Sequence, residues 1–359
     1  MIPLTEDITV DTLYRMLSLP NEQSAELVSV ASRIKEEYVG NIVYLRGLIE
    51  YSNICSKNCY YCGIRCGNGK VHRYTMEESE VVEAALYAYR KGMGSIVIQA
   101  GERKDHIYIK GMARLLETIM QKTNGGLRIT LSLGEQSRDV FRLWRECGVE
   151  RYLLRIEDSS KELYKKIHPA DSNHSYSKRI KAIEDLKAEG YQVGSGFMIG
   201  LPFQTIEDIV NDLLFLKRYD IDMVGMGPYV ESEDTPLYQY RHLLLPKNQR
   251  LDLTIKVVAA LRIMAKNINI AATTAMQTLA DNGRERAIVA GANVIMPNLT
   301  PQKYRSDYHL YKNKPILKES TEDNLSELEK RIESTGNIVG YNLFGDSKHF
   351  TDRVHGTSQ

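Results

Sequence analysis

Short runs of apolar and β-branched residues recur along the chain and are separated by segments with helical spacing. Between the first two runs, Glu77 to Lys91 repeats apolar residues at helical intervals, and Thr205 to Arg218 does so later. Before the first run, residues 8–38 show the pattern of two short amphipathic helices. The pattern predicts strands at 42–52, 95–101, 128–134, 151–157, 193–200, 223–230, 268–275 and 293–298.

Eight strands alternating with helices predict an α/β fold with a parallel sheet and right-handed crossovers. Repeats of about thirty residues fit a complete (β/α)8 TIM barrel. A doubly wound open sheet is the alternative, although no G-x-G-x-x-G follows the first strand. We expect a single domain with an N-terminal helical cap at 1–40, the barrel at 41–300 and a closing segment at 301–359. The last of these contains a C-terminal helix at 321–335.

Composition narrows the class of protein. The 47 basic and 46 acidic residues give a formal net charge of +1, without the basic stripe expected of a nucleic-acid-binding protein. The start of the chain lacks the apolar core of a signal peptide, and no apolar run reaches the roughly eighteen residues of a membrane span. Four of the five cysteines cluster together, which does not suit a disulfide framework. We expect a reduced, anaerobic, cytoplasmic setting, with no membrane and no nucleic-acid partner.

The cysteine cluster follows the first predicted strand directly. Cys55, Cys59 and Cys62 have C-x3-C-x2-C spacing, and Cys66 lies just beyond. Three close thiolates can hold a 4Fe–4S cluster and leave its fourth iron open. A zinc site usually draws on two separated cysteine pairs, and a four-cysteine ferredoxin is a much smaller protein. The spacing therefore favours an iron–sulfur cluster, with Cys66 as a neighbouring free thiol; the alternative is that Cys66 also ligates iron.

Polar side chains follow several other predicted strands, where the chemistry of such barrels is found. Arg155 and Glu157 alternate along the fourth strand and therefore point to the same face, where an inward charged pair needs a partner or a ligand. Thr273 and Thr274 end the seventh strand and could donate hydroxyls to an anion or a small polar substrate. The alternative is that these threonines only fill a strand.

The cysteine spacing, with an aromatic residue before the third cysteine, resembles the radical S-adenosylmethionine (SAM) superfamily. The resemblance implies that Cys55, Cys59 and Cys62 bind the cluster and that its open iron binds SAM. It implies that Gly101 and Glu102 hold the SAM amino group, Glu157 the ribose and Arg179 the carboxylate, with Tyr61 near the cluster and adenine. From the residues alone, Glu102 could instead cap a helix, and Arg179 could lie on a solvated helix face.

Longer stretches resemble the HydE family of FeFe-hydrogenase maturases over roughly residues 40–345. They include TLSLGE, RYLLRIE, IAATTAM and GANVIMPNLTPQKYRSDYHLY. The resemblance implies that a 5′-deoxyadenosyl radical attacks the sulfur of a small iron-bound cysteine complex carrying CO and CN. It implies the maturation proteins HydG and HydF as partners and a low-potential electron donor. The implied substrate residues are Thr130, Ser132, Arg155, Thr273, Thr274, Tyr308 and Tyr311.

Departures from that family keep alternatives open. Ile156 stands where a polar histidine is expected, and Lys104 begins an altered loop after Glu102. A related enzyme acting on another amino-acid or thiol substrate, similar to methylornithine synthase or biotin synthase, is one alternative. A metallocluster scaffold without SAM chemistry is another, but a scaffold would have no need of a ribose or carboxylate site.

Overall fold

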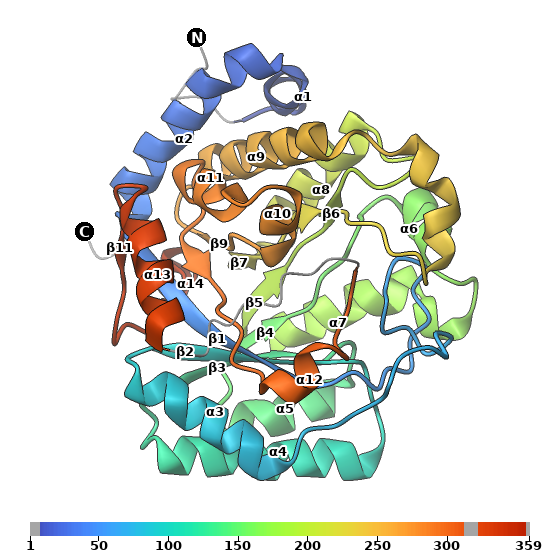
Figure 1. Cartoon of the computed structure of the whole chain (residues 1–359), viewed down its shortest axis with the longest axis vertical. Coiled ribbons are helices and arrows are strands. Elements are labelled where there is room, and N and C mark those ends of the chain that lie inside the picture. Colours follow the sequence, from blue (N-terminus) through green and yellow to red (C-terminus); the bar gives the residue numbers. More distant parts are fainter. Residues whose placement is uncertain (1–7, 312–321, 357–359) are drawn as a thin grey trace.

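The computed structural model describes residues 8–311 and 322–356. Its centre is a curled parallel sheet (Figure 1) in which eight strands follow the order β10-β1-β2-β3-β4-β5-β7-β9. The strands are β1 (Ile42–Ser52), β2 (Ser95–Ala100), β3 (Arg128–Ser132), β4 (Arg151–Leu153), β5 (Gln192–Ser195), β7 (Met223–Val224), β9 (Asn269–Ile270) and β10 (Val294–Ile295). An α/β fold with a parallel sheet was predicted and is confirmed.

The edge strands β9 and β10 approach each other at one point. Ala271 and Val294 form an isolated parallel bridge, and the backbone N–H of Ala272 donates to the carbonyl of Val294 at 2.9 Å. The N–H of Asn293 donates in turn to the carbonyl of Ile270 at 2.9 Å. These contacts join the two ends of the curled sheet.

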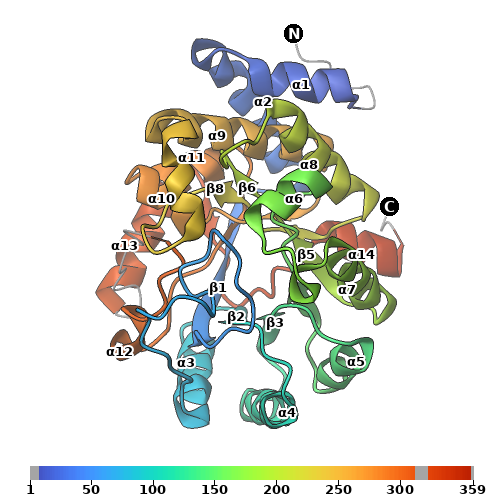
Figure 2. The ribbon, with the colours of Figure 1, turned by 90° about the vertical axis from the view of Figure 1, so that its right-hand side faces the viewer.

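Helices cover the outside of the sheet (Figures 1 and 2). Those between the strands are α3 (Glu78–Arg90), α4 (His106–Lys122), α5 (Arg138–Glu146), α6 (Lys161–Ile167), α7 (Tyr176–Ala188), α8 (Ile206–Arg218), α9 (Lys247–Met264), α10 (Thr274–Leu279) and α11 (Gly283–Val289). Capping boxes begin α3, between Glu77 and Glu80, and α8, between Thr205 and Asp208. The two helices predicted from their spacing are therefore present.

Two further helices precede the first strand, as predicted. They are α1 (Val10–Ser18) and α2 (Ser24–Val39), joined by the short 3-10 helix η1 (Asn21–Gln23). Both pack against α9, and α1 also contacts α8. Their buried residues, among them Leu13, Leu17 and Leu27, join the main hydrophobic core.

Several predicted strands are shorter than their apolar runs. Two of the runs divide, and their second halves, β6 (Met198–Ile199) and β8 (Gly227–Pro228), pair with each other. Gly196 lies at one division, where an added Cβ would meet the carbonyl oxygen of Gly225 at 2.1 Å. The fourth run leaves regular strand geometry after Leu153, and Glu157 has a left-handed φ of 70°.

The predicted C-terminal helix is present as α13 (Glu322–Glu333), while residue 321 lies outside the described residues. It is not the last element, because β11 (Ile338–Val339) pairs with the start of β1 and α14 (Lys348–His355) follows. Two 3-10 helices, η2 (Ser172–His174) and η3 (Pro236–Leu243), and the short α12 (Gln302–Arg305) complete the described elements. No helix in the described ranges is long and apolar enough to cross a membrane.

A polar cluster fills the sheet interior at the end opposite the strand carboxyl ends. Arg151 is fully buried, and its Nε donates to the carboxylate of Asp346 at 3.1 Å. Gln192 donates to the same carboxylate at 3.0 Å. Burial alone would raise the pKa of Asp346, but Arg151, Gln192 and Arg128 together outweigh it and hold that pKa below its usual value. The segment after β11 thus closes this end of the sheet.

Candidate active site

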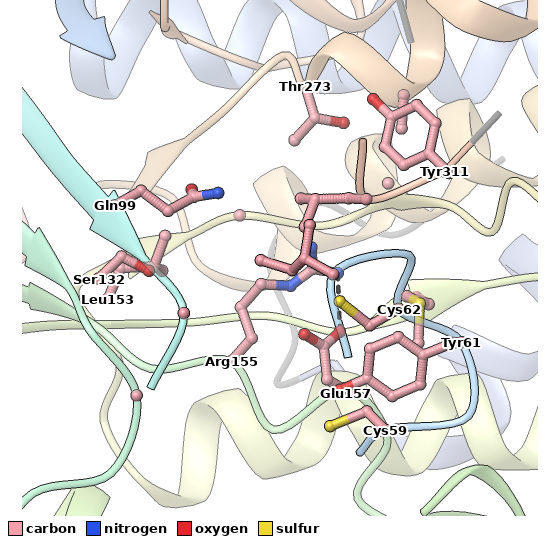
Figure 3. Close-up of a pocket in the computed structure, with 18 of the residues that line it drawn as sticks. Cys59, Tyr61, Cys62, Gln99, Ser132, Leu153, Arg155, Glu157, Thr273 and Tyr311 are labelled. Atoms are coloured by element: carbon pink, nitrogen blue, oxygen red, sulfur yellow. Dashed lines mark ion pairs between the residues drawn. The ribbon is translucent and has the colours of Figure 1, made fainter. Parts of the chain in front are cut away.

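A cavity of about 310 Å³ opens where the central strands end and their loops begin. It brings together residues predicted from separate parts of the sequence (Figure 3). Those lining it are Cys55, Cys59, Tyr61, Cys62, Gly101, Glu102, Ser132, Arg155, Glu157, Arg179, Thr273, Thr274, Tyr308 and Tyr311. Thr130 is not among the lining residues; it is buried on β3, two positions before Ser132.

The three closely spaced cysteines lie on the loop after β1 and face this cavity. Burial raises the pKa of the Cys59 thiol to about 12 and that of Cys62 well above its usual value. Cys66 is exposed and absent from the lining. The buried thiols would need a nearby positive charge to ionise, which bound iron supplies.

Backbone geometry around Cys55 suits a thiolate. The N–H groups of Lys57 and Glu102 both lie within hydrogen-bonding reach of Cys55 Sγ, at 3.4 and 3.3 Å. Gly101 allows this approach, since a Cβ there would lie 2.4 Å from the carbonyl oxygen of Ile54. Within the described ranges, no three His, Cys, Asp or Glu side chains converge on a single ion. A cubane cluster does not need such convergence, because each of its cysteines binds a different iron. The three-cysteine donor set therefore fits a cluster better than a mononuclear metal.

Glu102 joins two loops at the cysteine end of the cavity. Its backbone carbonyl accepts from the N–H of Ser56 at 2.9 Å, and its carboxylate accepts from the N–H of Glu135 at 2.8 Å. Lys57 and Lys104 approach the same carboxylate at 3.5 and 3.0 Å. Glu102 is buried and does not cap α4, whose N-cap is Asp105.

Arg155 and Glu157 form the charged pair expected from their spacing. Arg155 Nη2 lies 3.0 Å from Glu157 Oε2 and donates to the carbonyl of Phe197 at 3.0 Å. Figure 3 shows Arg155 between the cysteine end and the opposite wall, with Glu157 beside Tyr61 and Cys62. Apart from this ion pair, Glu157 Oε2 and Arg155 Nε are buried and have no hydrogen-bond partner among the described residues. Buried polar atoms of this kind at a cavity wall indicate a ligand site.

Arg179 is buried rather than exposed on a helix face. It extends from α7, and its Nε donates to Glu135 at 2.6 Å while Nη1 donates to the carbonyl of Arg155. Burial would raise the pKa of Glu135, but Arg179 and Lys57 outweigh it and hold that pKa below its usual value. Glu135 is therefore a buried anion between two cations.

Hydroxyl and amide groups also line the cavity. Gln99 donates to the Tyr308 hydroxyl at 3.2 Å, and the Thr273 hydroxyl donates to the carbonyl of Met226 at 3.2 Å. Burial raises the pKa of Tyr311, which favours its neutral hydroxyl. With Arg155 beside them, these groups suit an anion that also accepts hydrogen bonds.

Tyr61 packs against a histidine on the other side of the cysteine loop. Its ring meets His168 edge-on at 5.4 Å between centroids, and its hydroxyl lies 3.3 Å from His168 Nε2. Burial lowers the pKa of His168 to about 3, so this imidazole stays neutral at physiological pH.

Sequence reasoning missed three buried residues of the site. Lys57 lies between two cysteines in the sequence, and its positive charge at that position could have indicated a residue of the site. Glu135 appeared only as the last residue of the TLSLGE stretch and was given no role. Glu50, which lines the cavity from β1 and accepts from Asn298 at 3.1 Å, was taken as part of a strand.

The comparisons with known proteins agree with this geometry. The family model described as "Radical SAM superfamily" matches residues 49–216. The [FeFe] hydrogenase maturase subunit HydE of Thermotoga maritima is 40% identical over 96% of this chain and 95% of its own length. A 3-methylornithine synthase of Methanosarcina acetivorans is 29% identical over 79% of this chain and 78% of its own.

Solved structures share the fold at lower identity. Methylornithine synthase PylB superposes with a TM-score of 0.79 at 24% identity, covering 94% of this chain and 96% of PylB. The maturase HydG gives a TM-score of 0.78 at 19% identity, covering 97% of this chain and 77% of HydG. Enzymes of the family use a 4Fe–4S cluster and SAM. The chain therefore belongs to the radical SAM superfamily, as an enzyme close to the hydrogenase maturase HydE.

Proposed function

We propose that this enzyme carries out the HydE step in assembly of the FeFe-hydrogenase active site. The observation that carries the proposal is one cavity lined by the three cysteines, by hydroxyl and amide groups and by Arg155. Figure 3 shows Arg155 between Cys62 and the polar side chains of Gln99 and Ser132. When bound, the cluster and SAM supply a 5′-deoxyadenosyl radical, which the proposed reaction directs at the sulfur of an iron-bound cysteine complex.

The cofactor residues in this proposal belong to the cysteine end. Cys55, Cys59 and Cys62 hold the cluster, and the backbone around Gly101 and Glu102 accommodates the SAM amino group. Glu157 accepts from the ribose hydroxyls, which is supported by its buried Oε2, an oxygen that makes an ion pair with Arg155 but no hydrogen bond among the described residues. Tyr61 flanks the adenine and the cluster.

The role that we propose for Arg179 uses only one part of its guanidinium. Its contacts to Glu135 and Arg155 use Nε and Nη1. A guanidinium has five N–H donors, so the Nη2 end is the part that we propose for the SAM carboxylate.

The proposed substrate residues line the same cavity beyond the cofactor residues. Arg155 pairs with the anionic, cysteine-bearing complex, while Thr273, Thr274, Tyr308 and Tyr311 offer hydroxyls to its oxygen and nitrogen atoms, together with Ser132. Hydroxyls hold an anion without adding a competing charge. In this proposal HydG supplies the complex, HydF is a further partner, and a low-potential donor supplies the electron, all in the cytoplasm.

The proposed architecture is a single radical SAM domain. Its N-terminal cap comprises the described residues 8–40, its complete (β/α)8 barrel residues 41–300, and its closing segment the described residues 301–311 and 322–356. The bridge between Ala271 and Val294 supports closure of the barrel at β9 and β10.

Anaerobic turnover tests the proposal. Purified protein with reconstituted cluster is incubated with SAM and dithionite, with and without a synthetic iron–cysteine–CO–CN complex, and 5′-deoxyadenosine is measured. We expect formation that the complex stimulates and that Cys59→Ser abolishes. Formation stimulated instead by a plain amino acid or thiol would point to a different substrate.

A further inference from the structure

Lys57 is a buried lysine inside the cysteine loop, midway between Cys55 and Cys59. Only 4% of the residue is exposed. Its ammonium lies 2.9 Å from Glu135 Oε2 and 3.5 Å from Glu102 Oε1, and it also donates to the carbonyl of Asn173. The ammonium therefore donates to Glu135 and Asn173 and forms an ion pair with Glu102, three groups that come from separate parts of the chain.

Lys57 also links the two residues whose backbone N–H groups approach Cys55. The N–H of Lys57 and the N–H of Glu102 are the two donors near Cys55 Sγ, and the Lys57–Glu102 ion pair joins their residues through their side chains. If the Lys57 ammonium moved away, the ion pair that joins Lys57 to Glu102 would be lost, and the two backbone N–H donors would no longer be held in place together.

We propose that Lys57 is a positioning residue that fixes these donors on Cys55 and whose buried positive charge raises the reduction potential of the cluster. The potential of an iron–sulfur cluster depends on nearby charge, hydrogen bonds to sulfur and exposure to solvent. A positive charge favours the reduced cluster, which is one unit more negative than the oxidised form. Low exposure keeps this interaction from being screened as a surface charge would be.

Glu135 supplies an opposing charge in the same network. It contacts the ammonium of Lys57 and the guanidinium of Arg179 directly. Neutralising Lys57 and neutralising Glu135 both break the ion pair, but they change the charge near the cluster in opposite directions. If Lys57 had a purely structural role, the two changes would not shift the reduction potential in opposite directions. The sign of the shift in potential therefore distinguishes an electrostatic role from a structural one.

Lys104 provides a matched control. It pairs with the same Glu102 carboxylate at 3.0 Å, yet 53% of its side chain is exposed, against 6% for Lys57. Removing the charge of Lys104 therefore also removes a cation from the Glu102 carboxylate. This cation lies on the solvent side, where water screens its effect on the cluster strongly.

The experiment is a mediated redox titration of the reconstituted cluster without SAM, followed by electron paramagnetic resonance. The variants are Lys57→Gln, Lys57→Arg, Glu135→Gln and Lys104→Gln, each with its iron content and apoprotein unfolding temperature recorded. We expect Lys57→Gln to weaken reduction about tenfold, which is a shift of 59 mV to lower potential for one electron. Glu135→Gln should shift the potential upward, whereas Lys57→Arg and Lys104→Gln should stay close to the wild type.

Equal potentials in Lys57→Gln and the wild type, with full iron content, would overturn the proposal. Shifts in the same direction for Lys57→Gln and Glu135→Gln would overturn it as well. If Lys57→Gln fails to hold a cluster, an upward shift of the potential in Glu135→Gln and an unchanged potential in Lys57→Arg support the proposal. The absence of that upward shift overturns it.

Discussion

The guanidinium of Arg179 lies 2.6 Å from the carboxylate of Glu135, inside the protein. Glu135 also contacts Lys57, while Arg179 donates to the backbone of Arg155. A continuous polar path therefore runs from the cysteine loop to the charged residue in the middle of the cavity. A change in the cysteine loop at one end of this path should therefore alter the position of Arg155 at the other end.

The assignment of the cluster ligands predicts different outcomes for neighbouring cysteines. Replacing Cys55, Cys59 or Cys62 by Ser removes a thiolate that faces the cavity, so iron and sulfide should fall from about four each. Cys66→Ser is the matched control, because that thiol is exposed and outside the cavity lining. Loss of the cluster in Cys66→Ser, or stoichiometric zinc in the wild type, would show the ligand assignment to be wrong.

Glu157→Gln should weaken SAM binding while the cluster stays in place. The change keeps the shape of the side chain but removes the charge that strengthens hydrogen bonds to the ribose, worth about 1.5–3 kcal/mol. We expect a loss of roughly tenfold to a hundredfold in affinity, measured by equilibrium binding to the reconstituted protein. An unchanged dissociation constant would refute the ribose role.

Thr273→Val combined with Thr274→Val should impair substrate binding without affecting the cluster. The valines keep the side-chain shape but remove two hydroxyls, and each lost partner of a buried anion costs about 1–3 kcal/mol. Hydrogenase maturation should fall steeply, while the SAM-bound cluster spectrum stays normal. Thr118→Val, on the outer helix α4, is the control. Wild-type maturation by the double variant would exclude these hydroxyls from substrate binding.

Asp346→Asn should destabilise the fold far from the cavity. The change leaves fully buried Arg151 without its anion, at a cost of about 3 kcal/mol, the lower end of the range because 26% of the Asp346 side chain is exposed. Chemical denaturation should show the loss, whereas Asp139→Asn, at a surface pair with Arg142, should not.

The pH dependence of that loss has a definite sign. Because the pKa of Asp346 is lowered in the folded protein, its stabilisation is complete above the unfolded value of about 3.9. It disappears as the pH falls through the folded value. The difference in unfolding free energy between Asp346→Asn and the wild type should therefore be full at pH 7 and shrink in acid. A difference independent of pH would contradict this ion pair.

The positions of the strands and most cavity residues could be predicted because they depend on local patterns. Apolar runs show where the strands lie, and the carboxyl ends of parallel strands meet at one edge, so Cys55, Arg155 and Thr273 were expected together. Strand lengths were harder to predict. The break at Gly196 depends on its contact with Gly225, a residue in another strand run.

The sequence could not show which charged residues pair with one another over long distances along the chain. Lys57 and Glu135 are 78 positions apart, and Arg151 and Asp346 are 195 apart. No local spacing predicts that such residues meet, and a charged residue in a loop usually remains in solvent. The side chain of Ile156, which replaces an expected polar residue, is fully buried.

Hydrogenase maturation in a host that lacks its HydE but makes the other maturation proteins tests the central claim most directly. The wild-type chain should restore active FeFe-hydrogenase, measured as hydrogen evolution from reduced viologen, and Cys59→Ser should not. If the wild-type protein is folded and holds its cluster but yields no active hydrogenase, the proposed substrate is contradicted.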